Sequence, residues 1–243
     1  MDLGLTDKVF IVTGASRGLG RACAEALVAE GARVVVAARD AEAVRRAADE
    51  IGAIGVAADL ADPAAAERLV DAARTTWGRL DGALISVGGP PGGPAMSLSD
   101  EQWRAAFEAV FLGAVRLSRA VVDALPAEGG SLAFVLSTSV KVPLAGLAAS
   151  NGLRPGIAML AKTMADELGP RGVRVNGLLP GRVLTDRIRE LFDDLDAEAA
   201  AVPLRRLGDP AEFGRVAAFV LSPAASYVTG AMIPVDGGAM RAL

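Results

Sequence analysis

Short apolar runs rich in β-branched residues alternate along the chain with longer, alanine-rich segments. The apolar residues within each run are nearly continuous, which is typical of strands buried on both faces. The runs are Lys8–Thr13, Ala32–Ala37, Ile54–Ala58, Asp81–Ser86, Ser131–Ser137, Val173–Leu178 and Ala231–Val235. Strand–helix alternation repeated this often predicts an α/β fold: a Rossmann-type, doubly wound parallel sheet of about seven strands with helices on both faces.

Helix start signals mark the segments between the runs. Asp62-Pro63 and Asp209-Pro210 each offer an N-cap carboxylate followed by a proline at the first helical position, and Glu212 completes a capping box. Longer helices are predicted over Ser99–Leu125 and Ser150–Leu168. No fixed-period repeat and no long linker divides the chain, so we expect one domain over residues 1–243.

Composition excludes several classes of function. The 25 Lys plus Arg against 29 Asp plus Glu leave a net charge of -4, which provides no broad attraction to nucleic acid or to an anionic membrane. The chain has no His and a single Cys, Cys23, so a histidine general base, a metal site built from these residues and an internal disulfide are excluded. The first residues do not resemble a signal peptide and no run of ~18 apolar residues occurs, so we expect a cytoplasmic protein.

The segment Thr13–Gly20, TGASRGLG, follows the first predicted strand and opens the first helix. Gly14 allows the tight turn, Gly18 lets the backbone approach a pyrophosphate, and Gly20 lets the helix pack closely on the strand. The N-terminus of the helix would present free N–H groups to the phosphates. The pattern predicts a dinucleotide-binding domain, against the alternative of an ordinary glycine-rich turn.

The same segment resembles the TGxxxGxG cofactor motif of the short-chain dehydrogenase/reductase family. The resemblance covers essentially the whole chain, and includes Asp59-Leu60, Arg174–Asn176, Pro180-Gly181 and Val228–Gly238. The most similar branch is that of the β-ketoacyl-acyl-carrier-protein reductases, a bacterial-type NADP(H)-dependent group acting on a ketone/alcohol pair. The resemblance therefore implies an oxidoreductase with a nicotinamide cofactor.

The resemblance also implies the cofactor contacts. They fall on Gly14, Ser16, Arg17, Gly18, Leu19, Gly20, Arg39, Asp59, Leu60, Gly88, Pro180, Gly181, Val183 and Thr185. Family members that prefer NAD place an acidic residue at the end of the second strand, where this chain has Ala38 followed by Arg39. Arg39 and Arg17 can both pair with a 2′-phosphate, so NADP(H) is predicted over NAD(H). The alternative for each arginine is a solvated surface charge.

The family's Asn–Ser–Tyr–Lys tetrad is largely absent from the matching positions. An alignment without gaps puts Ser137 at the serine, Ser150 at the tyrosine, Arg154 at the lysine and Val110 at the asparagine. No shifted alignment restores the tyrosine, because the only Tyr of the chain is Tyr227, near the C-terminal strand. The resemblance therefore implies a degenerate catalytic tetrad.

The candidate catalytic residues are Ser137, Ser150, Arg154 and Lys141. Ser150 and Arg154 lie four residues apart on one predicted helix, so both can face the nicotinamide. At the position of the family's lysine, Arg154 can bind ribose hydroxyls of the cofactor and stabilise a developing alkoxide, but it cannot donate a proton. Lys141 is the only titratable amine near Ser137, and the alternative is a solvated loop lysine. Asn151 is a candidate for orienting the substrate, although an asparagine suits the start of a helix in any case.

Two functions stay open at this stage. The first is an NADP(H)-dependent oxidoreductase for a small carbonyl or alcohol, with a rewired proton donor or with water in that role. The second is a nucleotide-binding family member without dehydrogenase activity, acting as a sensor or a partner subunit. The intact phosphate loop argues against a purely structural role.

The predicted helices also indicate how the subunits assemble and which segment closes over the substrate. Ser150–Leu168 is apolar over more than one narrow stripe, which favours packing on two sides. In the resembled family this helix and the one matching Ser99–Leu125 build a dimer that pairs into a tetramer, so a homotetramer or homodimer is expected. Val183–Ala201 matches the segment that closes over the substrate.

Overall fold

A sheet of parallel strands forms the centre of the computed structural model, which describes residues 1–242. Its strands are β1 (Val9–Thr13), β2 (Arg33–Ala38), β3 (Ile54–Ala57), β4 (Gly82–Ser86), β5 (Gly130–Val135), β6 (Val173–Pro180) and β7 (Met232–Val235), in the spatial order β3-β2-β1-β4-β5-β6-β7. All seven predicted strands are confirmed, with shifts of at most two residues at their ends. The Rossmann-type parallel fold is therefore confirmed as well.

The chain winds outward in both directions from the centre of the sheet. β1 pairs with β2 on one side, where Val12 lies opposite Val36, and with β4 on the other, where it lies opposite Leu84. The strand order thus reverses between β1 and β4. In such sheets ligands bind beyond the carboxyl ends of the strands at this switch point.

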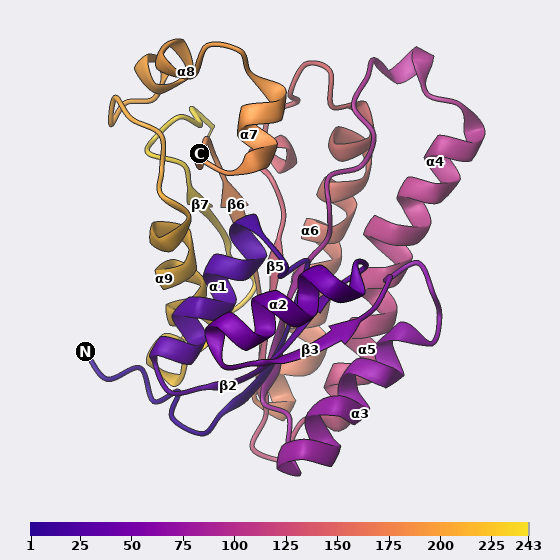
Figure 1. Cartoon of the computed structure of the whole chain (residues 1–243), viewed down its shortest axis with the longest axis vertical. Coiled ribbons are helices and arrows are strands. Elements are labelled where there is room, and N and C mark those ends of the chain that lie inside the picture. The colour runs from indigo at the N-terminus through magenta and orange to yellow at the C-terminus, as the bar shows by residue number, and fades with distance from the viewer. Residues whose placement is uncertain (243) are drawn as a thin grey trace.

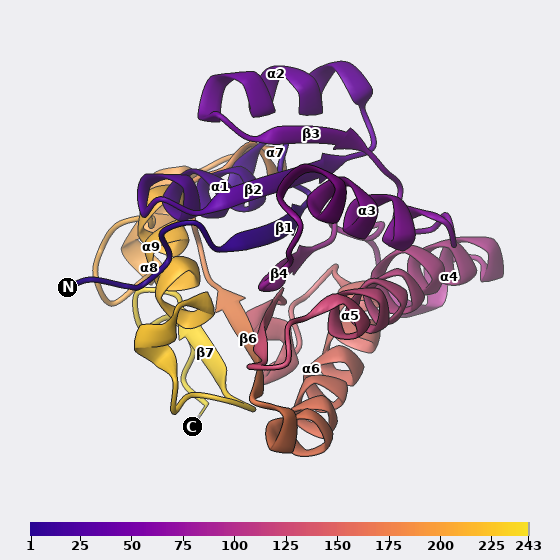
Figure 2. The same ribbon diagram turned by 90° about the horizontal axis from the view of Figure 1, so that it is seen from below.

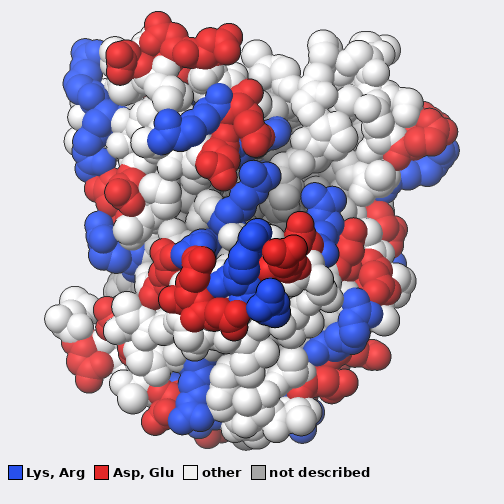
Figure 3. Space-filling view, viewed as in Figure 1, with Lys and Arg blue, Asp and Glu red and all other residues white. Residues whose placement is uncertain are grey.

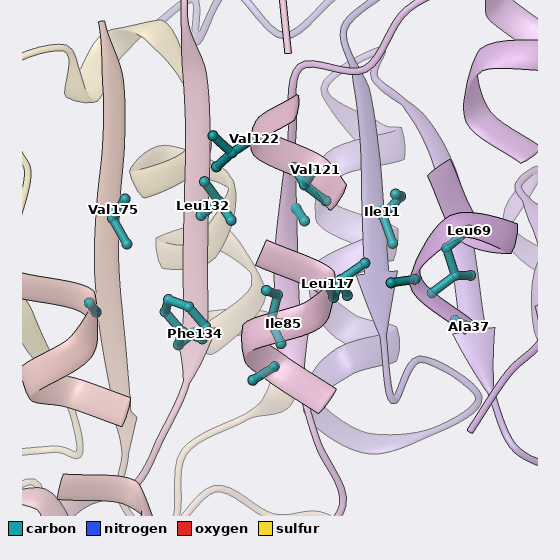
Figure 4. Packing of buried hydrophobic residues seen from close by; sticks show 14 of the residues in the cluster. Ile11, Ala37, Leu69, Ile85, Leu117, Val121, Val122, Leu132, Phe134 and Val175 are labelled. Carbon is teal, nitrogen blue, oxygen red and sulfur yellow. The ribbon is translucent and has the colours of Figure 1, made fainter. Parts of the chain in front are cut away.

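Helices cover both faces of the sheet (Figures 1 and 2). One face packs against α1 (Gly18–Ala29), α2 (Ala41–Ile51) and α9 (Pro210–Leu221), and the other against α3 (Ala65–Trp77), α5 (Gly113–Ala124) and α6 (Ala148–Leu168). Figure 4 shows the hydrophobic core on the face covered by α3, α5 and α6. There Ile11, Ile85 and Leu132 of neighbouring strands pack against Leu69 and Leu117 of the helices. The near-continuous apolar runs exist because both faces of these strands are buried.

The helix signals are confirmed in most places. Asp209 and Glu212 form the predicted capping box at the start of α9, and a second capping box at Ser99 opens α4 (Asp100–Ala106). The long helix predicted from Ser99 is interrupted by a π-helical turn, Phe107–Leu112, before α5 continues it.

The helix start at Asp62-Pro63 was predicted two residues too early. α3 begins at Ala65, because the Asp62 carboxylate accepts a hydrogen bond from the Ala64 N–H at 3.0 Å and forms a separate turn before the helix. The same carboxylate receives the Arg68 guanidinium at 2.8 Å. A side chain that bonds to the backbone within its own turn competes with helix initiation.

Basic and acidic side chains are interspersed over the face seen in Figure 3. The same view shows a hollow in its upper half, between the segments that carry α7 (Asp186–Leu191) and α4. Within residues 1–242, none of the helices combines the length and the apolar character that crossing a bilayer requires.

A buried carboxylate ties together the opposite edge of the sheet, where the strands begin. Asp81 accepts hydrogen bonds from the Val9 N–H at 2.9 Å, from Lys8 Nζ at 3.2 Å and from the Arg79 guanidinium at 2.9 and 2.6 Å. Burial alone would raise the pKa of Asp81, but the bonds from Arg79 and Val9 and the charge of Lys8 outweigh it, so the pKa lies below its usual value. The ionised form therefore stabilises the fold.

Asp81→Asn should lower the free energy of unfolding at pH 7 by about 2 kcal/mol, because charge-assisted bonds to partly exposed cations are lost. The folded-state pKa is depressed, so this stability is present above the unfolded-state pKa of ~3.9 and is lost as the pH falls through the folded value. Urea denaturation of both proteins at pH 7 and near pH 3 measures the difference, which should shrink at the lower pH. Asp71→Asn, at an exposed position on α3, is the control. An equal loss in both variants would contradict the role given to Asp81.

Candidate functional site

The glycine-rich turn joins the ends of β1 and β4. Thr13 Oγ1 donates a hydrogen bond to the Ser86 carbonyl at 2.8 Å and accepts one from the Ser86 N–H at 2.9 Å. Gly14 has a φ of +62°, and a Cβ there would lie 2.7 Å from the Ser86 carbonyl oxygen. A Cβ on Gly20 would lie 2.3 Å from the Gly14 carbonyl oxygen. Glycine is required at both positions, because the backbones of the turn, β4 and α1 touch there.

An open cradle lies over this turn and fits the pyrophosphate of a dinucleotide. A Cβ on Gly18 would contact only Thr185, at 3.6 Å, and a Cβ on Gly88 would meet nothing within 4 Å. The N-cap residue of α1, Arg17, places no side-chain hydrogen bond on the N–H groups of the first turn. Those N–H groups are therefore available to an anion at the positive end of the helix.

The other residues predicted to contact the cofactor lie around the same edge of the sheet. Pro180 ends β6, Val183 is buried beyond it, and Thr185 precedes α7 and approaches Gly18. The structure thus brings together the two segments that sequence analysis assigned to the nicotinamide and pyrophosphate ends. Gly181 packs against Asp236, where a Cβ would lie 2.5 Å from the Asp236 side chain.

On the adenine side of the predicted site, Asp59 and Leu60 follow β3. The Asp59 carboxylate is exposed and accepts a hydrogen bond from the Ala61 N–H at 3.0 Å, and Leu60 packs closely over Gly113 of α5. Ser16 and Leu19 are half-buried within the glycine-rich segment. All of these residues border the end of the sheet at which β1 and β2 also finish.

The two arginines predicted to bind a 2′-phosphate have different surroundings. Arg17 Nη1 lies 3.6 Å from the Asp186 carboxylate and 3.8 Å from that of Glu190, both on α7. Arg39 is exposed just beyond the end of β2, and within residues 1–242 no carboxylate pairs with it. Arg39 is therefore the more available of the two cations.

α7 lies across the mouth of the site. In addition to the pairs with Arg17 on one side, the guanidinium of Arg187 lies against Gly89 in the loop after β4, 3.3 Å from where a Cβ would stand. The following helix, α8 (Leu195–Ala201), is held by an ion pair between Arg182 and Glu198, and the Arg182 guanidinium sits 4.9 Å from the centre of the Phe192 ring. The predicted closing segment, Val183–Ala201, thus bridges the glycine turn and the β4 loop.

Two serines lie at the position that the alignment assigns to the family's serine. Ser137 turns its hydroxyl to its own backbone, where it accepts a hydrogen bond from the Ser139 N–H at 3.1 Å. Ser139, which sequence analysis missed, lies with its Oγ 3.2 Å from Ser150 Oγ, and both residues are buried. The second serine of the STS run, two residues after Ser137, is the sequence signal for this contact.

A buried cation stands one helical turn beyond this serine pair. Arg154 is 7% exposed and donates a hydrogen bond from Nη1 to the Val135 carbonyl at 2.8 Å. Burial lowers the pKa of its guanidinium to about 10, so Arg154 stays charged at neutral pH. Val110 is buried within the π-helical turn and brings no polar group to the site. Tyr227 is fully exposed in the segment before β7.

The loop between β5 and α6 is held firmly beside the serine pair. Asn151 binds the backbone of Leu144 twice, accepting from its N–H at 3.1 Å and donating to its carbonyl at 2.8 Å. The Gly93 N–H donates to the Gly146 carbonyl at 2.7 Å and joins this loop to the one after β4. Asn151 therefore positions the loop, which accounts for it without contact to a substrate. Lys141 is exposed on the same loop, two residues beyond Ser139.

A groove of about 470 Å³ runs between these two loops. Its walls consist of glycines and of Pro94, Ala95, Pro143, Leu144, Ala145, Ala148 and Asn151. No charged side chain lines it. The groove begins beside the first turn of α6, which carries Ser150.

Comparison with known proteins gives the same picture over the whole chain. Residues 14–240 match the family model described as enoyl-(acyl carrier protein) reductase. A 3-oxoacyl-[acyl-carrier-protein] reductase of Salmonella typhimurium is 35% identical over 235 residues, covering 95% of this chain and 96% of that protein. An L-rhamnose 1-dehydrogenase (NAD(P)(+)) of Azotobacter vinelandii is 34% identical over 248 residues, covering 96% of this chain and 97% of that protein.

Solved structures of related proteins superimpose on this chain over its whole length. The L-sorbose reductase of Gluconobacter frateurii, in its complex with NADPH and L-sorbose, has a TM-score of 0.92 at 32% identity, with 100% of both chains covered. A short-chain dehydrogenase/reductase of Brucella melitensis has a TM-score of 0.94 at 30% identity, again with 100% of both chains covered. The similarity therefore includes every element that surrounds the site.

Proposed function

The chain belongs to the short-chain dehydrogenase/reductase family, and we propose that it is an NADP(H)-dependent oxidoreductase acting on a small ketone/alcohol pair. Its relatives include oxidoreductases of small molecules. The observation that carries the proposal is the open cradle at the N-terminus of α1, where Gly18 and Gly88 leave space and Gly14 and Gly20 admit no side chain.

The cofactor would be held by residues from several segments. The N–H groups of Gly18, Leu19 and Gly20, with Ser16 and Gly88 beside them, suit the pyrophosphate. Asp59 and Leu60 suit the adenine, Arg39 the 2′-phosphate, and Pro180, Gly181, Val183 and Thr185 the nicotinamide end. The NADPH bound to the sorbose reductase supports this choice of cofactor.

The nicotinamide, when bound, supplies or accepts the hydride. We assign Ser139 and Ser150 to holding the substrate oxygen and Arg154 to stabilising the alkoxide electrostatically. None of these three side chains is a proton donor at neutral pH, because serine hydroxyls are too weakly acidic and the guanidinium keeps its proton. Lys141 or a water molecule supplies the proton in this scheme. The site thus works with Ser150 and Arg154 in place of the family's tyrosine and lysine.

The cofactor preference provides the test of this proposal. The protein should bind NADPH more tightly than NADH, and Arg39→Asp should reverse the order, because a 2′-phosphate would meet a carboxylate instead of a guanidinium. We expect a loss of about 10- to 100-fold in NADPH affinity, measured by fluorescence titration of both nucleotides. Arg74→Asp, at an exposed position on α3, is the control and should leave both affinities unchanged. Equal affinities in the unmodified protein would refute the NADP(H) assignment.

A homodimer or homotetramer is proposed for the assembly. Met159 on α6 and Phe107 at the start of the π-helical turn are exposed, and Phe107 stacks on Phe111 with ring centres 5.1 Å apart. These apolar surfaces belong to the two long helical segments that sequence analysis assigned to subunit contacts. Light scattering at micromolar concentration should give at least the mass of a dimer, and a monomer mass would count against the assignment.

The absence of a phenol beside Ser139 favours one other function, nucleotide binding without turnover in a sensor or partner subunit. A sensor or partner subunit of this kind would bind NADPH with the preference described above. It would not oxidise NADPH with any carbonyl compound. Measurable oxidation of NADPH by any ketone, at a rate proportional to protein concentration, would exclude this alternative.

A further inference from the structure

Arg187 of α7 lies over the loop that follows β4. The residue is exposed, and its Cζ, Nε and Nη2 atoms lie 3.3 Å from the position that a Cβ on Gly89 would occupy. The guanidinium is therefore the part of the side chain that contacts this glycine. Because position 89 carries no side chain, the cation comes close to the backbone of the loop.

The open cradle at the N-terminus of α1 borders the same loop. Gly88 directly precedes Gly89, and among residues 1–242 nothing lies within 4 Å of a Cβ built on it. On the other side of the cradle, the atoms near a Cβ on Gly18 belong to Thr185, two residues before Arg187. α7 thus spans the cradle, with Thr185 beside the glycine-rich turn and Arg187 beside the β4 loop.

The charged side chains of α7 are divided between these two sides. Asp186 and Glu190 lie 3.6 and 3.8 Å from Arg17 Nη1, beside the glycine-rich turn. Glu190 follows Arg187 by three residues, the spacing of a helical ion pair, but its carboxylate lies near Arg17 instead. Within residues 1–242 no carboxylate pairs with Arg187. Arg17 therefore has two countercharges nearby, whereas Arg187 has none.

A bound pyrophosphate would need more positive charge than the end of α1 supplies. Each of its phosphate groups is negatively charged, and a helix N-terminus is equivalent to only about half a positive charge. The planar fork of an arginine matches a pair of phosphate oxygens. Arg187 offers such a fork next to Gly88, and its charge is not already used by a carboxylate.

We propose that Arg187 binds the pyrophosphate of the dinucleotide, opposite the N–H groups of α1, and thereby holds α7 over the cofactor. Sequence analysis placed the pyrophosphate contacts in the glycine-rich segment, and Arg187 adds one from the closing segment. The inference rests on the cofactor site proposed above. Because NADPH and NADH share the pyrophosphate, Arg187 serves both, in contrast to Arg39, which is assigned to the 2′-phosphate.

ADP-ribose tests this contact without turnover, since it contains the pyrophosphate but has no nicotinamide and no 2′-phosphate. Calorimetric titration should show about 10-fold weaker binding of ADP-ribose to Arg187→Met than to the unmodified protein, because a charge-assisted contact is lost. Arg187→Lys should keep part of the affinity. Arg187→Glu should bind several-fold more weakly than Arg187→Met, because a carboxylate repels phosphate. Fluorescence titration of Arg187→Met should show the same factor of loss for NADPH and for NADH.

Arg189→Met is the matched control. Arg189 is an exposed arginine of the same six-residue helix, and two residues along a helix turn a side chain by about 200°, away from the side that contacts Gly89. This variant should bind ADP-ribose and both nucleotides within about 2-fold of the unmodified protein. Thermal unfolding of each variant verifies folding. Equal losses in Arg187→Met and Arg189→Met would assign the effect to the stability of α7 and would overturn the proposal.

The remaining outcomes separate this inference from the proposed function. Unchanged binding of ADP-ribose in Arg187→Met and Arg187→Glu would overturn the inference and leave the oxidoreductase function standing. A loss confined to NADPH would also overturn it, because Arg187 would then serve the 2′-phosphate. The expected losses in a protein that oxidises NADPH with no ketone would leave the contact standing and refute the oxidoreductase function. An unmodified protein that binds neither ADP-ribose nor NADPH would refute both.

Discussion

Replacing Ser150 by tyrosine and Arg154 by lysine should raise turnover of neutral ketones by about 10²–10⁴-fold, the usual contribution of a general acid. The two positions lie one turn apart on α6, and Ser139 already faces position 150 at hydrogen-bond distance. A phenol with a pKa of ~10 beside a lysine can give up a proton that an aliphatic hydroxyl cannot. Steady-state oxidation of NADPH with a simple β-keto thioester and with an unbranched ketone measures the gain.

The single variants are the controls for this experiment. Ser150→Tyr alone should gain less than the pair, and Arg154→Lys alone should gain nothing, since the phenol is still missing. Ser150 is 5% exposed, so melting temperature and NADPH affinity verify that the tyrosine is accommodated. If the unmodified protein reduced neutral ketones as fast as an ordinary family member, the prediction would be wrong. An efficient general acid would then already be present, and Lys141→Met would be the first variant to make.

Gly20→Ala should reduce NADPH affinity by at least 100-fold and lower the free energy of unfolding by about 1–3 kcal/mol, as overpacking does. The added Cβ would lie 2.3 Å from the Gly14 carbonyl oxygen and 2.9 Å from that of Thr13, so α1 must move away from the turn. That movement displaces the N–H groups that would face the pyrophosphate. Fluorescence titration and urea denaturation measure the two effects.

Gly169→Ala is the matched control, because nothing lies within 4 Å of a Cβ at that position, which caps α6 with a φ of -51°. It should change neither the affinity nor the stability by a comparable amount. An unchanged NADPH affinity in Gly20→Ala would mean that the cofactor cradle lies elsewhere.

Features set by neighbouring residues could be predicted from the sequence by itself. The strands follow from apolar runs whose side chains are buried on both faces, and α9 begins where the capping box at Asp209 places it. The turn at Gly14 and Gly20 could be predicted from the spacing of its glycines after a strand, and the close approach of Gly20 to the Gly14 carbonyl oxygen is local. The contact of Gly14 with the Ser86 carbonyl oxygen, in contrast, arises only when β4 packs beside the turn. Even here a competing local bond mattered, since the Asp62 carboxylate delayed the start of α3.

Only the tertiary structure decided which side chains meet across loops. Ser139 rather than Ser137 reaches Ser150, because the path of the loop after β5 sets which hydroxyl faces α6, and a residue count along the chain carries no such information. Arg17 pairs with carboxylates of α7 that lie far from it in sequence. Arg154 is buried, and within residues 1–242 no carboxylate pairs with it, which is likewise a property of everything packed around it. Backbone preferences act between neighbours in the chain, whereas the surroundings of a charge depend on segments that only folding brings together.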